Sequence, residues 1–195
     1  MTTGTIPGTR NSAGLPHGEQ RMFSWAEARA QLSGLPGGHL NIAYEAIDRH
    51  VAAGRGARIA IRWIAKDGSC QDVSYADLES ETNRFANLLS QLGLRPGQRV
   101  FSLLGRVPAL YTAALGALKA GCVFSPLFSA FGPEPVQARM SIAEGRVLVT
   151  TEAYYKKKVA PMRLRAFPRA YECPSYRRRC GLAEGLDMYA NMAYM

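Results

Sequence analysis

The chain has 195 residues, of which 47% are hydrophobic, and a formal net charge of +9. This length suits one ordinary domain with tails, and the apolar fraction is that of a globular protein with a sizeable core. No stretch approaches the roughly 20 apolar residues of a membrane-spanning helix, and the N-terminus lacks the apolar region of a secretory signal. We therefore expect neither a membrane protein nor a secreted one.

Two predicted helices precede the first strands. Residues 1–22 are rich in Gly, Thr, Pro and Ser and are expected to form a disordered leader. Ser24 and Glu27 have the capping-box spacing, which predicts a helix start. Asn41 is a candidate N-cap for a second helix that ends at Gly54.

A hairpin and a long helix come next. Apolar residues alternate on both sides of an Asp67-Gly68 turn: Ile59, Ile61 and Trp63 before it, and Val73 and Tyr75 after it. Ser74 and Asp77 then predict a capped helix that runs to Gly93. Its apolar stripe indicates packing against a core and consists of Leu78, Phe85, Leu88, Leu89 and Leu92.

Residues 98–151 form the central unit of the sequence. Short β-rich runs near residues 101–104, 122–127 and 146–150 alternate with helix-length segments that begin at Pro108 and Pro133. This order is typical of parallel strands joined by right-handed crossover helices. The sequence therefore predicts an α/β protein with a partial doubly wound parallel sheet, preceded by a helical lead-in and a β-hairpin.

Several side chains of this unit receive structural interpretations. Tyr111, Leu115 and Leu118 repeat at helical spacing. Lys119 lies at a helix end, where it would complement the helix dipole. Three aromatic residues beside the second strand are assigned to the core: Phe124, Phe128 and Phe131.

The segment after Pro161 differs from the rest of the chain. It has no clear two-residue or 3.6-residue period, and nine basic but only three acidic residues lie from Lys156 to Met195. The net charge is thus mostly a property of this end of the chain. We predict three regions: a leader (1–22), an incomplete domain (23–162) and a basic tail (163–195) that is disordered or read out of frame.

Self-contained catalytic motifs are absent from the sequence. It has no Walker-type phosphate loop and no GxGxxG, HExxH or GxSxG pattern. The histidines and cysteines show no metal-ligand spacing, so no metal site is predicted and the cysteines are expected to be free thiols of a cytoplasmic protein. We assign no catalytic residue.

Several blocks resemble one family in order and spacing. VSYADLESETNRFANLLSQLGLRPGQRV and ALGALKAGCVFSPLFSAFGPEPVQARM are similar to the opening of the acyl-adenylate-forming, AMP-binding synthetases. LPGGHLNIAYEAIDRH and RVLVTTEAYYKKKVAP resemble the acetyl-CoA synthetases among them. The resemblance runs from about Phe23 to Arg163. It implies ATP- and Mg-dependent formation of acetyl-AMP from acetate, followed by acetyl transfer to coenzyme A.

The resemblance also implies that this chain is an N-terminal fragment. The family's phosphate loop, acetate pocket and catalytic-lysine domain would all lie beyond the matching residues. We therefore expect a truncated acetate–CoA ligase that is inactive alone and binds no cofactor tightly. The resemblance implies one site element: Lys156 and Lys158, with Lys157 between them, match positions where the family contacts the phosphates of coenzyme A, so these three lysines are the candidate cofactor-binding residues. A solvated charge run is the competing interpretation of these lysines.

Two alternatives to a ligase fragment follow from the sequence: a nucleic-acid-binding module and a fragment without a function of its own. The segment from Lys156 to Arg179 interleaves basic residues with tyrosines, as in modules that contact nucleic-acid phosphates and stack on bases. Its irregular spacing matches no nucleic-acid motif, so nucleic acid is the less favoured partner. The fragment could also lack any function of its own, because a three-stranded sheet leaves an open edge that invites aggregation.

Overall fold

The computed structural model describes residues 24–162 and, as backbone, residues 186–190. The predicted leader and most of the predicted tail lie outside this range. The chain divides into two units, residues 1–32 and 33–195. The described part of the first unit is one short helix, α1 (Trp25–Ala30), in which the Ser24 hydroxyl accepts a hydrogen bond from the amide of Glu27.

The second unit begins with a helical segment and a hairpin. Asn41 Oδ1 accepts hydrogen bonds from the amides of Ala43 and Tyr44, at 2.9 and 3.3 Å, and so starts the predicted helix. This helix includes two π-helical stretches, η1 (Tyr44–Asp48) and η2 (Val51–Arg55). The strands β1 (Ile59–Ile64) and β2 (Cys70–Ser74) follow, antiparallel as predicted, with Gly68 at a φ of +83° in the turn.

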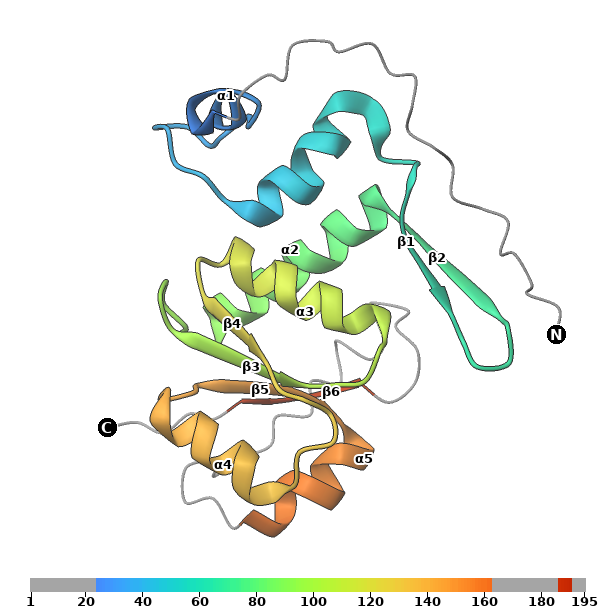
Figure 1. Ribbon diagram of the computed structural model, residues 1–195, viewed down its shortest axis with the longest axis vertical. Helices are drawn as coiled ribbons and strands as arrows, with labels where there is room; N and C mark the ends of the chain where they lie inside the picture. Colours follow the sequence, from blue (N-terminus) through green and yellow to red (C-terminus); the bar gives the residue numbers. More distant parts are fainter. Residues whose placement is uncertain (1–23, 163–185, 191–195) are drawn as a thin grey trace, which may run out of the picture. The chain divides into compact units, whose positions relative to one another are not determined.

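A four-stranded sheet with helices on both faces forms the rest of the unit (Figure 1). Its strands lie in the order β4-β3-β5-β6. The three strands predicted from the sequence, β3, β4 and β5, are parallel. The elements in chain order are α2 (Tyr75–Gln91), β3 (Arg99–Leu103), α3 (Pro108–Lys119), β4 (Val123–Pro126), α4 (Pro133–Ile142), β5 (Val147–Thr151), α5 (Glu152–Tyr154), η3 (Tyr155–Val159), η4 (Ala160–Met162) and β6 (Leu186–Ala190).

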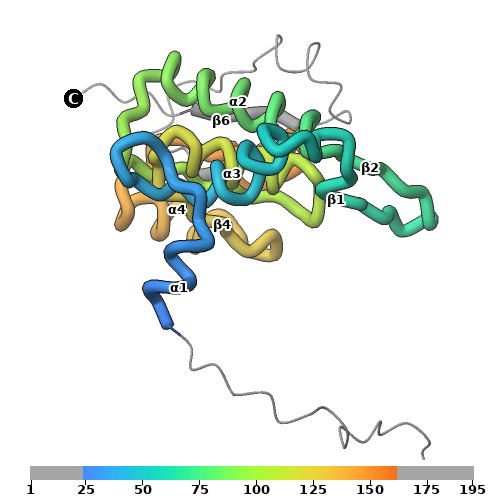
Figure 2. The backbone as a smooth tube through the Cα atoms, turned by 90° about the horizontal axis from the view of Figure 1, so that it is seen from above, coloured from blue at the N-terminus to red at the C-terminus, as the bar shows by residue number. Residues whose placement is uncertain are grey.

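The two faces of the sheet carry separate cores. Phe85 and Leu89 of α2 and Ala113 and Ala117 of α3 pack on one face, and α2 and α3 lie side by side in Figures 1 and 2. On the other face Val136 and Met140 of α4 pack against Phe101, Leu103, Leu148 and Val159. The chain passes from β3 to β4 and then back across β3 to β5. Right-handed crossovers in opposite directions place α3 and α4 on opposite faces.

The buried residues of α3 are not the large ones that repeat at helical spacing in the sequence. Tyr111 is 52% exposed, whereas the buried residues are small: Ala109, Thr112, Ala113, Gly116 and Ala117. A Cβ atom added at Gly116 would lie 2.8 Å from Phe85 Cδ1 and 2.9 Å from the carbonyl oxygen of Thr82. Small residues therefore face α2 because the two helices approach too closely for larger side chains.

Lys119 also has a role that its position at a helix end did not indicate. Its Nζ lies 2.8 Å from Asp48 Oδ1 and donates a hydrogen bond of 2.8 Å to Asn83 Oδ1. The neighbouring Leu118 carbonyl accepts a hydrogen bond from Asn41 Nδ2. These contacts join the helical segment that starts at Asn41 to both α2 and α3.

A partly buried carboxyl group lies between α2 and α3. Thr112 Oγ1 donates a hydrogen bond of 2.9 Å to Glu81 Oε2. Burial raises the pKa of the Glu81 carboxyl, and the hydrogen bond from Thr112 offsets part of this rise. The folded chain thus holds this proton more tightly than the unfolded chain does. The free energy of unfolding falls as the pH rises from the ordinary glutamate pKa through the raised value.

Glu81→Gln is expected to flatten this part of the pH profile and to raise stability at neutral pH. Glutamine keeps an oxygen that accepts the Thr112 hydrogen bond but cannot ionise. Urea unfolding of both chains at a series of pH values from 4.5 to neutral measures the effect. An identical pH dependence in the two chains would contradict the assignment.

The tail contributes one regular element that the sequence analysis did not anticipate. Residues 186–190 form β6, which pairs antiparallel with β5. Five residues form too short a segment to show a decisive period of two, and the pairing joins residues far apart in the sequence. The proposed three-part division of the chain stays a prediction.

Candidate functional site

The carboxyl ends of β3, β4 and β5 mark the candidate site. The strand order reverses at β3, since β4 and β5 lie on opposite sides of it. In such sheets ligands bind beyond the carboxyl ends of the strands near this reversal. Two loops begin there, after Leu103 and Pro126, and the helix α5 follows Thr151 directly. Within the sheet, Thr150 Oγ1 donates a hydrogen bond of 2.9 Å to the carbonyl oxygen of Leu103 and so fixes the ends of β3 and β5 relative to each other.

The three predicted site lysines follow β5 directly. Thr151 caps the short helix α5, because its hydroxyl accepts a hydrogen bond from the Tyr154 amide at 3.2 Å. The chain continues into η3, which carries Lys156, Lys157 and Lys158. All three therefore lie on the segment that leaves the carboxyl end of β5.

The structure separates the three lysines by their surroundings. Lys156 Nζ lies 2.5 Å from Glu152 Oε1 in an exposed ion pair one helical turn apart. Lys157 is exposed. Lys158 is half-buried, donates a hydrogen bond to the carbonyl oxygen of Ser129 and lies 4.8 Å from the centroid of the Tyr154 ring. Lys158 thus ties η3 to the loop after β4, and Lys157 presents its charge to solvent.

The loop after β4 brings an exposed aromatic ring to the same place. Phe128 is 66% exposed, so its assignment to the core was wrong. Its ring contacts Phe131 edge-on, with centroids 5.7 Å apart, and the Arg139 guanidinium lies 4.3 Å from the Phe131 centroid. Phe124 and Phe131 are partly buried against the two cores, as expected. Phe128 follows Leu127, a buried residue directly after the end of β4, and lies exposed in the loop.

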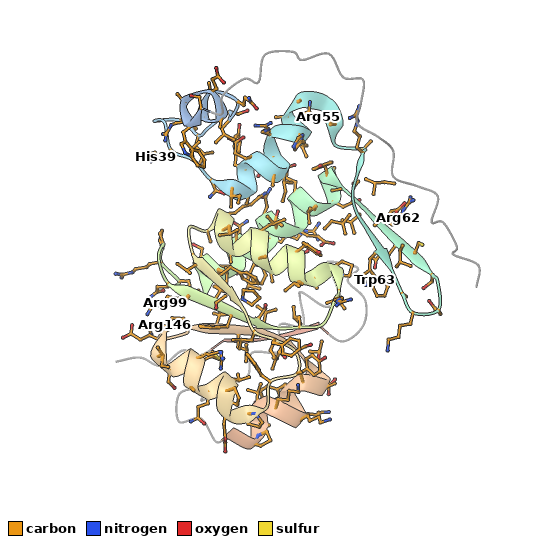
Figure 3. All side chains as sticks on the ribbon, in the orientation of Figure 1. His39, Arg55, Arg62, Trp63, Arg99 and Arg146 are labelled. Atoms are coloured by element: carbon orange, nitrogen blue, oxygen red, sulfur yellow. The ribbon has the colours of Figure 1, made fainter. Side chains whose placement is uncertain are left out.

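The hairpin reaches the loop after β3. Trp63 lies on the hairpin (Figure 3) and donates a hydrogen bond of 2.7 Å from Nε1 to the carbonyl oxygen of Arg106. The Arg106 residue is exposed. The two residues are 43 positions apart, and only the alternation of the hairpin marked Trp63 in the sequence. This contact anchors the loop from which α3 starts.

Neither a metal cluster nor a membrane-spanning helix is present in the part of the chain that the structure describes. Within residues 24–162 no three His, Cys, Asp or Glu side chains gather as a metal site requires. None of the helices there is long and apolar enough to cross a membrane.

The arrangement can hold an anion next to a planar group. The exposed lysines Lys156, which is paired with Glu152, and Lys157 lie on η3, and the exposed phenyl ring lies on the loop after β4. The Lys158–Ser129 hydrogen bond holds these two segments together. Ammonium groups bind phosphate as point charges, and an aromatic face accepts a base by stacking. The sequence marked the lysines as candidates but not Phe128, whose exposure depends on where β4 ends.

Comparison with known proteins identifies what these elements belong to. The family model described as "AMP-binding enzyme" matches residues 48–176. The chain is 37% identical over 155 residues to the acetyl-coenzyme A synthetase of Bacillus subtilis, covering 77% of this chain and 27% of that protein. It is 35% identical over 138 residues to the 3-hydroxypropionyl-coenzyme A synthetase of Sulfurisphaera tokodaii, covering 68% and 21%.

Solved structures of CoA-ligating enzymes also resemble this chain. An acyl-CoA synthetase from Brucella canis superimposes with a TM-score of 0.63 at 33% identity, covering 69% of this chain and 24% of that one. A benzoate CoA ligase from Burkholderia xenovorans gives a TM-score of 0.53 at 25% identity, covering 60% and 22%. The chain spans about a quarter of the length of these relatives. Its predicted α/β fold and family resemblance are confirmed, and the chain belongs to the AMP-binding enzyme family.

Proposed function

We propose that this chain supplies the N-terminal part of an acetate–CoA ligase, which uses ATP and Mg to form acetyl-AMP and then transfers the acetyl group to coenzyme A. Relatives named acetyl-coenzyme A synthetase support acetate as the acid. The matched relatives are about four times longer than the matched segment, which supports the expectation that residues 1–195 do not complete catalysis alone.

This chain contributes the residues that bind the phosphates and the adenine of coenzyme A. The observation that carries this proposal is the Lys158–Ser129 hydrogen bond, which brings the lysines of η3 next to the loop of Phe128. Lys156 and Lys157 face the phosphates, Lys158 holds the two loops together, and the Phe128 ring stacks on the adenine base. The ligand binds weakly, because only one side of it is contacted and the ammonium groups stay in water.

Lys157→Ala is expected to raise the Kd of coenzyme A for this chain by roughly threefold to tenfold, a loss of about 1 kcal/mol. The variant removes a positive charge from an exposed side chain and leaves the fold intact. Titration of coenzyme A followed by NMR chemical shifts measures the change and is suited to weak binding. Phe128→Ala should weaken binding by a similar factor and should reduce the shifts of the adenine protons.

The matched control is Lys66→Ala. Lys66 is an exposed lysine in the turn of the hairpin, so its loss changes the net charge by the same amount at another place. An equal loss of affinity in both lysine variants would show a general charge effect and contradict the assigned site. The proposal of incomplete catalysis has its own test, since acetate-dependent exchange of pyrophosphate into ATP by the purified chain would refute it.

We do not propose nucleic-acid binding as a second function of this chain. The basic residues from Lys156 to Arg179 are irregularly spaced and match no nucleic-acid motif. Most of them lie outside the residues that the structure describes. Salt-sensitive retention of single-stranded RNA, without retention of coenzyme A, would reverse this preference.

A further inference from the structure

The strand β5 has the composition of a segment that pairs readily with other strands. Its sequence VLVTT is rich in β-branched residues and contains no charge and no proline. Val147, Leu148, Val149 and Thr150 are each fully buried in the sheet. An uncovered strand of this kind exposes a row of backbone donors and acceptors and invites pairing with another chain.

The two outer positions of the sheet are protected in different ways. β4 lies at one edge, has only four residues and ends at Pro126, which has no amide proton to donate. Short edge strands and edge prolines discourage pairing between molecules. β5 has neither feature, so its outer edge needs a cover.

That cover comes from a segment outside the family match. All five residues of β6 pair with β5, from Leu186 opposite Thr151 to Ala190 opposite Val147. The match to the family model ends at residue 176, so β6 lies beyond it. Its direction is antiparallel, in contrast to the parallel pairing of β3, β4 and β5.

We propose that Leu186–Ala190 is a covering strand, which the chain places on its own β5 to block association of two copies through that edge. Residues 163–185 join Met162 to Leu186, so the covering strand belongs to the same chain as β5. A strand tethered in this way has an effective concentration in the millimolar range. At micromolar protein the chain's own strand therefore occupies the edge before that of a second copy.

A pair of proline substitutions tests the register of this strand. In an antiparallel pair the amide groups of successive residues point alternately toward and away from the neighbouring strand. Of Met188→Pro and Tyr189→Pro, one removes a hydrogen bond to β5 and the other alters an amide that points away. Only one of the two is expected to speed hydrogen exchange at outward-pointing β5 amides, by about tenfold or more, and to produce dimers in gel filtration.

Two internal controls keep this test independent of global unfolding. The amides of β3 should keep their protection in both variants, and Ala193→Pro, outside β6, should behave like the parent chain. A synthetic peptide of residues 184–195 should restore exchange protection and the monomer in the affected variant. Unchanged β5 exchange in both proline variants, or no rescue by the peptide, would overturn the proposal.

The source of the covering strand is tested by dilution of the parent chain. A tethered strand gives β5 protection that is independent of protein concentration. Protection that falls on dilution together with a dimer would place a second copy's strand on the edge and overturn the assignment. Hydrogen exchange and gel filtration are measured without coenzyme A, so a failure of this proposal is distinguishable from a failure of the proposed function.

Discussion

Phe85→Ala is expected to lower the free energy of unfolding by about 3–5 kcal/mol, the usual range for deleting a buried phenylalanine. Phe85 is 1% exposed and lies in the core between the sheet and the pair α2 and α3. Its ring lies directly against Gly116, so truncation leaves a cavity at the closest approach of the two helices. Urea denaturation measures the change from the shift in midpoint at constant slope.

Phe128→Ala is the matched control because it deletes the same side chain at an exposed position. Phe128 is 66% exposed, and its replacement is expected to change stability by about 0.5 kcal/mol or less. Losses of equal size at the two positions would show that the core does not lie between α2, α3 and the sheet. A large loss at Phe128 alone would mean that its ring is covered in solution.

Lys119→Ala is expected to cost about 2–4 kcal/mol, because it leaves Asp48 without its partner in a confined place. The Lys119 side chain is 10% exposed and that of Asp48 is 21% exposed. Removing one member of a buried ion pair leaves an uncompensated charge, and residual exposure reduces the usual penalty of 3–5 kcal/mol. Thermal unfolding and hydrogen exchange at residues 41–55 measure the loss, which should be greatest in this segment.

Lys156→Ala provides the comparison with an exposed pair. The Lys156 and Glu152 side chains are 72% and 45% exposed, so their ion pair should contribute about 0.5 kcal/mol or less. The double variant of Lys119→Ala with Asp48→Asn should recover part of the loss, since the stranded charge is then absent. A double variant as unstable as the sum of the two single variants would contradict coupling between these side chains.

Local sequence signals predicted most of the secondary structure. Ser24, Asn41 and Ser74 cap the helices that they were expected to cap, and each uses a side-chain oxygen to accept neighbouring amides. Gly68 adopts the positive φ that its turn requires. These features depend on residues within four positions of one another, so the sequence alone contains the necessary information.

The features that the sequence did not predict depend on the tertiary structure. Phe128 belongs to an apolar stretch of sequence, which indicated burial. In the structure it directly follows the buried Leu127 and is exposed. Lys119 meets Asp48 across 71 positions, and Trp63 meets Arg106 across 43. No local pattern encodes such pairs.

The order of strands and helices in residues 98–151, with their caps and turns, determined the parallel sheet and the family resemblance from the sequence alone. Backbone propensity and hydrophobic period act over a few residues, which is why these features are legible in one dimension. Only the tertiary structure decided that Lys158 joins Ser129, that Phe128 faces solvent and that residues 186–190 cover β5. Each of these depends on which distant segments the folded sheet brings together.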